Sequence, residues 1–96
     1  MRTISLQAVA DELEQFIRKT FHVTADDILF TRQVHLYQEG YVDSVGVLET
    51  IAHLEQTWDV SIPPTAIFDP LFTHIEGIAR YVLALKEARQ RACASS

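Results

Sequence analysis

The stretch Gly40–Trp58, GYVDSVGVLETIAHLEQTW, decides the fold, because it holds a helix start followed by a helix with one apolar side. Asp43 and Ser44 are good N-cap residues, since a short side-chain oxygen can accept from the first backbone N–H groups of a helix. One narrow arc of the helical wheel carries Val47, Ile51, Leu54 and Trp58. The sequence therefore predicts a helix from Ser44 to about Thr57, with this arc in the core.

A second arc of the same helix mixes small apolar groups with acids. It carries Val45, Leu48, Glu49, Ala52, Glu55 and Gln56. The unpaired N–H groups and the positive dipole end at the helix start favour a negative group, such as a phosphate ester on Ser44. We therefore expect Ser44 to carry one, with the second arc as a docking surface. The alternative is that Val45 and Ala52 are ordinary exposed residues and Ser44 is an unmodified cap.

The chain before this stretch predicts one helix and one long loop. From Ser5 to Thr20, apolar residues recur in steps of three and four, at Leu6, Val9, Leu13, Phe16 and Ile17. The segment Phe21–Tyr41 keeps no single period, and we interpret it as an ordered loop. We expect it to be anchored to the core by Val23, Ile28, Leu36 and Tyr37. Loops of this length in small domains are usually functional.

The chain after Trp58 predicts two further helices. Pro63 and Pro64 end the second helix and can open a short third helix over Thr65–Phe68, which Asp69-Pro70 breaks. Thr73 with Glu76 is a capping-box pattern for a fourth helix. The core stripe of that helix is Ile75, Ile78, Ala79, Val82 and Leu85. The sequence thus predicts an all-α four-helix bundle with a short third helix, as a single domain over 1–86 and a polar, small-residue tail over 87–96.

Composition excludes several classes of function. The formal net charge of −5 argues against nucleic acid as a partner and favours a basic protein surface. No segment approaches the roughly 20 apolar residues of a membrane span, and the start has no signal-peptide core, so we expect a cytoplasmic location. The lone cysteine, Cys93, lies in the expected tail as an exposed thiol, which excludes an internal disulfide.

Catalytic and metal-binding motifs are not found in the sequence. The four histidines at 22, 35, 53 and 74 have no HExxH or paired i, i+4 spacing, so we expect no resident metal. The sequence Val42–Gly46 is not the GxSxG elbow of a serine hydrolase, and we expect no enzyme. An acid beside a phosphoryl acceptor commonly shares a divalent cation with it, so Asp43 next to Ser44 suits a serine modified by another protein.

From about Leu6 to Leu85 the chain resembles the acyl carrier protein superfamily of phosphopantetheinylated carriers. The resemblance rests on Gly40–Val45, Leu48-Glu49, Leu54-Glu55, Trp58 and Val60–Pro63. It implies a four-helix bundle of the acyl-carrier type. It also implies that Ser44 holds 4'-phosphopantetheine through a phosphodiester, whose thiol bears an acyl or aminoacyl group as a thioester. Asp43, by the same resemblance, helps hold magnesium and is recognised by the modifying enzyme.

The resemblance also implies the partners. These are a phosphopantetheinyl transferase, an acyl- or aminoacyl-activating ligase, and downstream acyl-transfer or condensing enzymes, which would dock on Val45, Leu48, Glu49, Ala52 and Glu55. Val45 and Gly46 stand where fatty-acid carriers commonly have Leu and an acid. The Tyr37–Tyr41 approach and Phe68-Asp69 are more similar to stand-alone carriers of D-alanine, amino acids or specialised acyl units. The rival interpretation is a non-enzymatic helical interaction module.

The size of the cargo can be addressed from the aromatic residues. Trp58, Phe68 and Phe72 are expected where the second, third and fourth helices meet. Because protein interiors are closely packed, these rings would leave little room for a buried chain. The sequence therefore predicts a small cargo carried outside the core.

Overall fold

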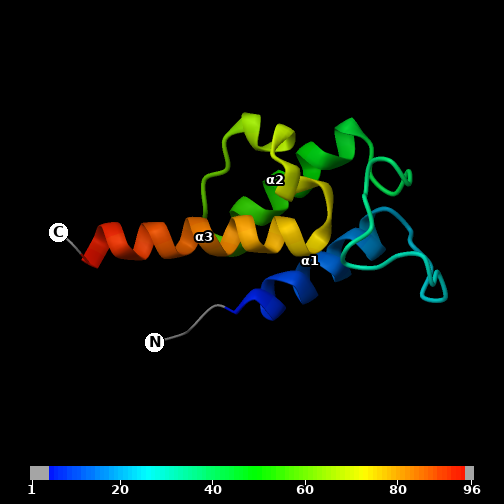
Figure 1. Ribbon diagram of the computed structural model, residues 1–96, viewed down its shortest axis with the longest axis horizontal. Coiled ribbons are helices and arrows are strands. Elements are labelled where there is room, and N and C mark those ends of the chain that lie inside the picture. The colour runs from blue at the N-terminus through cyan, green and yellow to red at the C-terminus, as the bar shows by residue number, and fades with distance from the viewer. Residues whose placement is uncertain (1–4, 95–96) are drawn as a thin grey trace.

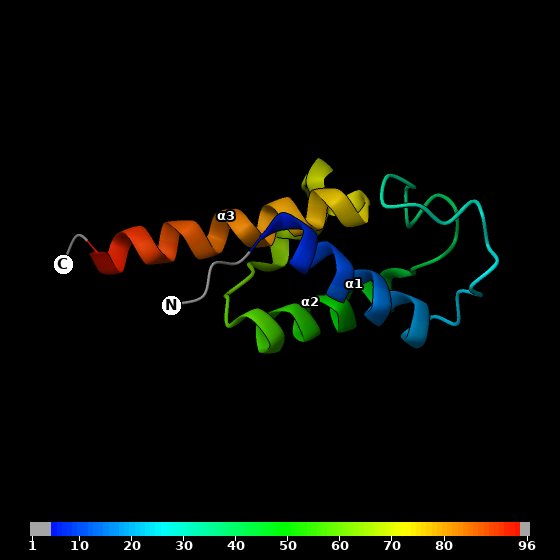
Figure 2. The same cartoon turned by 90° about the horizontal axis from the view of Figure 1, so that it is seen from below.

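The described part of the chain folds as three α-helices and two short 3-10 helices around one core. The computed structural model describes residues 5–94, without the side chains of 89–94, and these residues contain no β-strand. The elements are α1 (Leu6–Thr20), α2 (Ser44–Trp58), η1 (Pro64–Phe68), η2 (Pro70–Thr73) and α3 (Ile75–Ala94). Figures 1 and 2 show the three α-helices side by side, with the loop 21–43 at the end of the molecule where α2 begins.

The predicted first helix is confirmed, with Ser5 as its cap. The Ser5 Oγ accepts a hydrogen bond from the Ala8 N–H at 3.1 Å, and Arg18 and Lys19 lie in the last turn, where they face the negative end of the dipole. The helices bury their predicted apolar faces together. The largest fully buried side chains are Val9, Leu13, Ile17, Leu36, Leu54, Phe72, Ile75, Ile78 and Val82.

The predicted all-helical fold is confirmed for the described residues, but the count of four helices is not, because the short third helix is 3-10 rather than α. Pro64 opens η1 and Pro70 opens η2, and Asp69 between them is extended, with φ −76° and ψ 132°. A helix accepts proline only in its first turn, so Pro70 cannot continue η1 and instead begins η2. Short 3-10 turns are a common way to connect helices in this situation.

The predicted capping box at α3 is also wrong. The Thr73 hydroxyl donates to the carbonyl oxygen of Pro70 at 2.8 Å, and the Glu76 carboxylate is engaged by Gln33 and Arg80. The Glu76 N–H donates instead to the carbonyl of Arg32 at 3.0 Å. The long loop therefore replaces the local cap at the start of α3.

At its other end α3 is longer than the sequence pattern predicts, since it continues to Ala94. Residues 86–92 are good helix formers, such as Lys, Glu, Ala, Arg and Gln, which explains why the helix persists after the core stripe ends. The predicted tail 87–96 thus begins inside the helix, and residues 95–96 and the Cys93 thiol lie outside the described part. No helix among the described residues has the length and apolarity to cross a membrane.

The loop 21–43 is held to the bundle at several points. Leu36 is buried, and its N–H donates to the carbonyl of Thr73 at 2.8 Å. Val23 and Tyr37 pack against the core as predicted, but the predicted anchor Ile28 is wrong, since its side chain is 88% exposed. Phe30, which is 5% exposed, takes its place.

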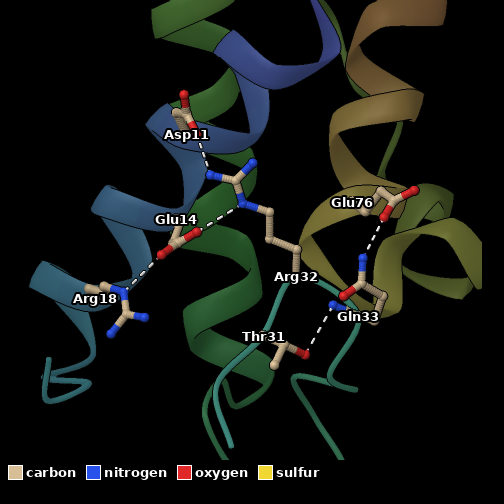
Figure 3. Close-up of polar contacts among 7 residues, drawn as sticks. All are labelled: Asp11, Glu14, Arg18, Thr31, Arg32, Gln33 and Glu76. Carbon is tan, nitrogen blue, oxygen red and sulfur yellow. Dashed lines mark hydrogen bonds and ion pairs between the residues drawn. The ribbon is translucent and has the colours of Figure 1, made fainter. Parts of the chain in front are cut away.

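A cluster of charges joins the middle of the loop to α1 (Figure 3). Arg32 contacts Asp11 and donates from Nε to the Glu14 carboxylate at 2.9 Å, while Arg18 donates to the same carboxylate at 3.0 Å. Burial alone raises the pKa of Glu14, but the hydrogen bonds from Arg32 and Arg18 outweigh it and lower that pKa. On the other side of the loop, Gln33 bonds Glu76 of α3.

Candidate functional site

Ser44 is the first residue of α2, and Asp43 is its N-cap. The Asp43 backbone is extended, and its Oδ1 accepts from the N–H of Gly46 at 2.6 Å, while its carbonyl oxygen accepts from the N–H of Val47 at 2.9 Å. Both Asp43 and Ser44 are exposed. Because the cap uses Oδ1, the second carboxylate oxygen of this exposed residue takes no part in the cap hydrogen bond.

The first turn of α2 has room for an anion. The cap satisfies the N–H of Gly46, and within the described residues the N–H groups of Ser44 and Val45 have no acceptor. These donors, with the positive end of a 15-residue helix, suit a phosphodiester on Ser44. The residues present therefore fit the group that the sequence predicts there.

Phe21, which sequence reasoning did not include, packs on this turn. A Cβ atom on Gly46 would lie 2.6 Å from Cε1 and 2.9 Å from Cζ of the Phe21 ring, well inside carbon–carbon contact distance. It would also lie 3.0 Å from Oδ1 of Asp43. A glycine is therefore required at position 46 because the Phe21 ring packs against its backbone, and not because of an unusual backbone angle. An isolated glycine inside a helical pattern was the signal available in the sequence.

The approach to Ser44 is fixed by Tyr41. Its hydroxyl donates to Oδ2 of Asp27 at 3.0 Å, and its ring meets Phe30 edge-on with centroids 4.9 Å apart. Burial, and then the hydrogen bond with Asp27, raise the pKa of Tyr41. Gly40 precedes it with φ 79°, a conformation that glycine adopts without strain.

An apolar pocket of about 380 Å³ opens beside Ser44. It is lined by Tyr37, Val42, Asp43, Ser44, Val47, Ile67 and Phe68. The Tyr37 hydroxyl donates to the carbonyl of Phe72 at 2.6 Å, and burial raises the pKa of Tyr37 to about 12. Pockets for small ligands occupy about 300–1,000 Å³, so this one can hold a short apolar group.

The three bulky aromatics do not all lie where the sequence predicted. Phe72 is fully buried and Trp58 packs against the core, but Phe68 is 81% exposed and stands at the pocket. The expectation that Phe68 fills the meeting point of the helices is therefore wrong. Phe68 sits between Pro64 and Pro70, and the 3-10 geometry of η1 turns Ala66 inward in its place.

The second arc of α2 is largely exposed. Val45 and Leu48 are 64% and 58% exposed, and Glu49 and Ala52 are exposed as well. Glu55 differs, because it is half-buried and its Oε2 accepts from the N–H of Ile62 at 2.9 Å. Glu55 therefore holds the chain that leaves α2. The accessible part of the predicted docking surface is Val45, Leu48, Glu49 and Ala52, with Gln56 exposed beside them.

The described residues contain no group of three or more His, Cys, Asp or Glu side chains that could hold a metal ion. His53 instead bridges two helices: its Nε2 lies 2.7 Å from Oε2 of Glu12, and its ring stacks on Phe16 at 3.9 Å. His35 and His74 bond to neighbouring residues of their own segments. These contacts are structural.

Comparison with known proteins identifies a family. The family described as the phosphopantetheine attachment site matches residues 11–82, about three quarters of the chain. No curated protein gives a significant match. The matched range begins in α1, includes Asp43, Ser44 and the pocket residues, and ends near the middle of α3.

Proposed function

Since the chain belongs to the phosphopantetheine attachment-site family, we propose that Ser44 is the residue that carries the prosthetic group. Proteins of this family bear covalently attached 4'-phosphopantetheine and are carriers, not catalysts. The chain is accordingly a carrier that interacts with modifying and synthetic enzymes. The single observation that supports Ser44 is its exposed hydroxyl at the first position of α2, directly after the capping Asp43.

The modification is a phosphoryl transfer with coenzyme A as donor and a separate transferase as catalyst. The Ser44 oxygen forms a bond to the phosphorus that bears the pantetheine, the bond from that phosphorus to adenosine 3',5'-bisphosphate breaks, and the serine proton leaves to a base of the transferase. Asp43 would share the divalent cation of the transferase through the carboxylate oxygen that the cap does not use. The first-turn N–H groups and the helix dipole stabilise the phosphodiester that results.

The loaded group is an acyl or aminoacyl thioester, delivered to partner enzymes in the cytoplasm. Those partners are an activating ligase and downstream acyl-transfer or condensing enzymes. The apolar lining of the pocket supports a cargo with an aliphatic or aromatic part over a purely polar one. Val45, Leu48, Glu49 and Ala52 are the surface that a partner meets beside the arm, because they are exposed on the helix that begins with Ser44.

A mass measurement tests the proposal. We expect the protein incubated with coenzyme A, magnesium and a broad-specificity phosphopantetheinyl transferase to gain one phosphopantetheine, and Ser44→Ala to gain none. Ser61→Ala is the matched control, since Ser61 is also exposed and lies beyond the other end of α2, and this variant should be modified normally. Asp43→Asn should keep the cap but slow the transfer, because an amide binds the cation poorly.

Two results would contradict the proposal. One is an unchanged mass of the wild type, which would favour a helical interaction module with Ser44 as a simple cap. The other is a mass gain that persists in Ser44→Ala, which would place the group on another side chain. Equal transfer rates for wild type and Asp43→Asn would contradict the proposed role of Asp43 in binding the cation, but not the attachment at Ser44.

A further inference from the structure

The contact between Phe21 and Gly46 joins the end of α1 to the first turn of α2. The residues are separated by the whole loop in sequence, yet Cε1 and Cζ of Phe21 occupy the space where a side chain at position 46 would begin. Gly46 is buried beneath this ring. The Phe21 ring therefore packs directly against the backbone of the first turn of α2.

The position of Phe21 is itself fixed from two sides. Its N–H donates to the carbonyl of Ile17 at 2.9 Å as the C-cap of α1, and its ring meets Phe16 edge-on at 6.3 Å. Phe16 in turn stacks on His53 of α2 at 3.9 Å. Movement of the Phe21 ring would therefore disturb contacts to both helices.

The same small space determines the geometry of the cap. Oδ1 of Asp43 lies 2.6 Å from the N–H nitrogen of Gly46 and would lie 3.0 Å from a Cβ there. From the other side of the turn, the Thr50 hydroxyl donates to the carbonyl oxygen of Gly46 at 2.9 Å. A group added at position 46 must displace the ring or the carboxylate, and the carboxylate belongs to the residue next to Ser44.

We propose that Phe21 is a positioning residue for the modification of Ser44. Its ring packs against Gly46 and holds the capped first turn of α2, which orients the Ser44 hydroxyl for phosphoryl transfer. This inference rests on the proposed function, because it concerns the reaction at Ser44. Phosphoryl transfer depends on in-line placement of the attacking oxygen, and a displacement near 1 Å can cost up to about a hundredfold in rate. The predicted docking residues Val45 and Leu48 are 64% and 58% exposed, so they remain accessible to the transferase.

A four-protein cycle tests this role: wild type, Gly46→Ala, Phe21→Leu and the double variant. Leucine removes the ring edge that includes Cε1 and Cζ while keeping an apolar side chain, so the double variant has room for the added Cβ. We expect Gly46→Ala to lower kcat for phosphopantetheine transfer roughly tenfold with little change in KM for the carrier. Phe21→Leu alone should also lower kcat, because the ring no longer holds the turn, and in that background Gly46→Ala should cost less than about twofold further. A Phe21→Leu protein with the kcat of wild type would overturn the inference.

The readout separates positioning from general stability. Alanine is a better helix former than glycine, so circular dichroism should show α2 intact in Gly46→Ala. The amide chemical shifts of residues 43–47 should differ clearly between wild type and Gly46→Ala, and much less between Phe21→Leu and the double variant. Three further results would overturn the inference: no effect of Gly46→Ala on kcat, an equal loss in both backgrounds, or a loss confined to KM. Failure of the wild type to gain mass would instead reject the proposed function.

Discussion

Replacing Arg32 by methionine isolates the charge cluster that fastens the long loop to α1. Methionine keeps much of the length of the arginine stem but removes the guanidinium, which contacts Asp11 and bonds Glu14 at 2.9 Å. The carbonyl of Arg32 still accepts from Glu76 at the start of α3, so the backbone tie is retained. The variant therefore measures the side-chain contribution to stability.

The expected loss follows from the exposure of the partners. The side chains of Arg32, Glu14 and Asp11 are 33%, 26% and 48% exposed, so each pair is screened by solvent and is worth roughly 0.5–1 kcal/mol. Arg18 still pairs with Glu14 in the variant, so no buried charge is left alone. We expect Arg32→Met to lower the free energy of unfolding by about 1–2 kcal/mol, which lowers Tm by roughly 5–10 °C in a domain of this size.

The pH dependence of that loss has a defined sign. The hydrogen bonds from Arg32 and Arg18 outweigh burial and lower the pKa of Glu14 from 4.5, its value in an unfolded chain. A group with a lowered folded pKa contributes stability above its unfolded pKa and loses it as pH falls through the folded pKa. The stability gap between wild type and Arg32→Met should therefore be full at neutral pH and should shrink below pH 4.5.

Urea unfolding followed by circular dichroism is the assay, at low and high salt. Arg80→Met is the matched control, since it removes one exposed i, i+4 pair with Glu76 and should cost less. At 1 M salt, where charges are screened within about 3 Å, the difference in free energy of unfolding between wild type and Arg32→Met should become smaller. An Arg32→Met protein as stable as wild type, or as stable as Arg80→Met, would refute the idea that this cluster holds the loop.

Two other predictions concern the pocket and the docking surface. Tyr37→Phe should lower the free energy of unfolding, because it removes the hydrogen bond to the Phe72 carbonyl. Burial raises the pKa of Tyr37 from 10.0 to about 12, so the contribution of the hydroxyl to stability is full below pH 10 and disappears as pH rises through 12. Ultraviolet titration with thermal melts can follow this loss. Val45→Asp should raise KM for the modifying transferase more than Glu49→Gln does, because it buries a charge in the apolar part of the contact, whereas Glu49 mainly speeds encounter. Stopped-flow kinetics on both folded variants measure this difference. If charge dominates docking, Glu49→Gln should impair the reaction with the transferase more than Val45→Asp does.

The helices could be predicted from sequence because their signals are local. Val47, Ile51 and Leu54 recur at helical spacing, and the structure buries all three on one face of α2. The start of α2 could be predicted equally well, since Asp43 is a strong cap residue and does cap this helix through the N–H of Gly46. For these parts of the site, propensity, periodicity and tertiary packing agree.

The loop could not be predicted in the same way, because no period tells which of its apolar residues turn inward. Ile28 and Phe30 are two residues apart and equally apolar, yet only Phe30 is buried. The choice depends on distant partners: the Arg18 guanidinium lies over the Phe30 ring at 4.7 Å, and the Tyr41 ring meets it edge-on with centroids 4.9 Å apart. Such contacts exist only after α1 and the loop have come together.

The position of Phe68 changes what the site can carry. A small cargo was expected because Phe68, Trp58 and Phe72 together would leave no space between the helices, but Phe68 is exposed and borders the pocket beside Ser44. A ring on the solvent side can turn without repacking buried neighbours, whereas a core ring cannot. If Ser44 carries the arm, as proposed, an apolar cargo that folds back along it would meet this apolar surface, and the steric argument against longer chains no longer applies.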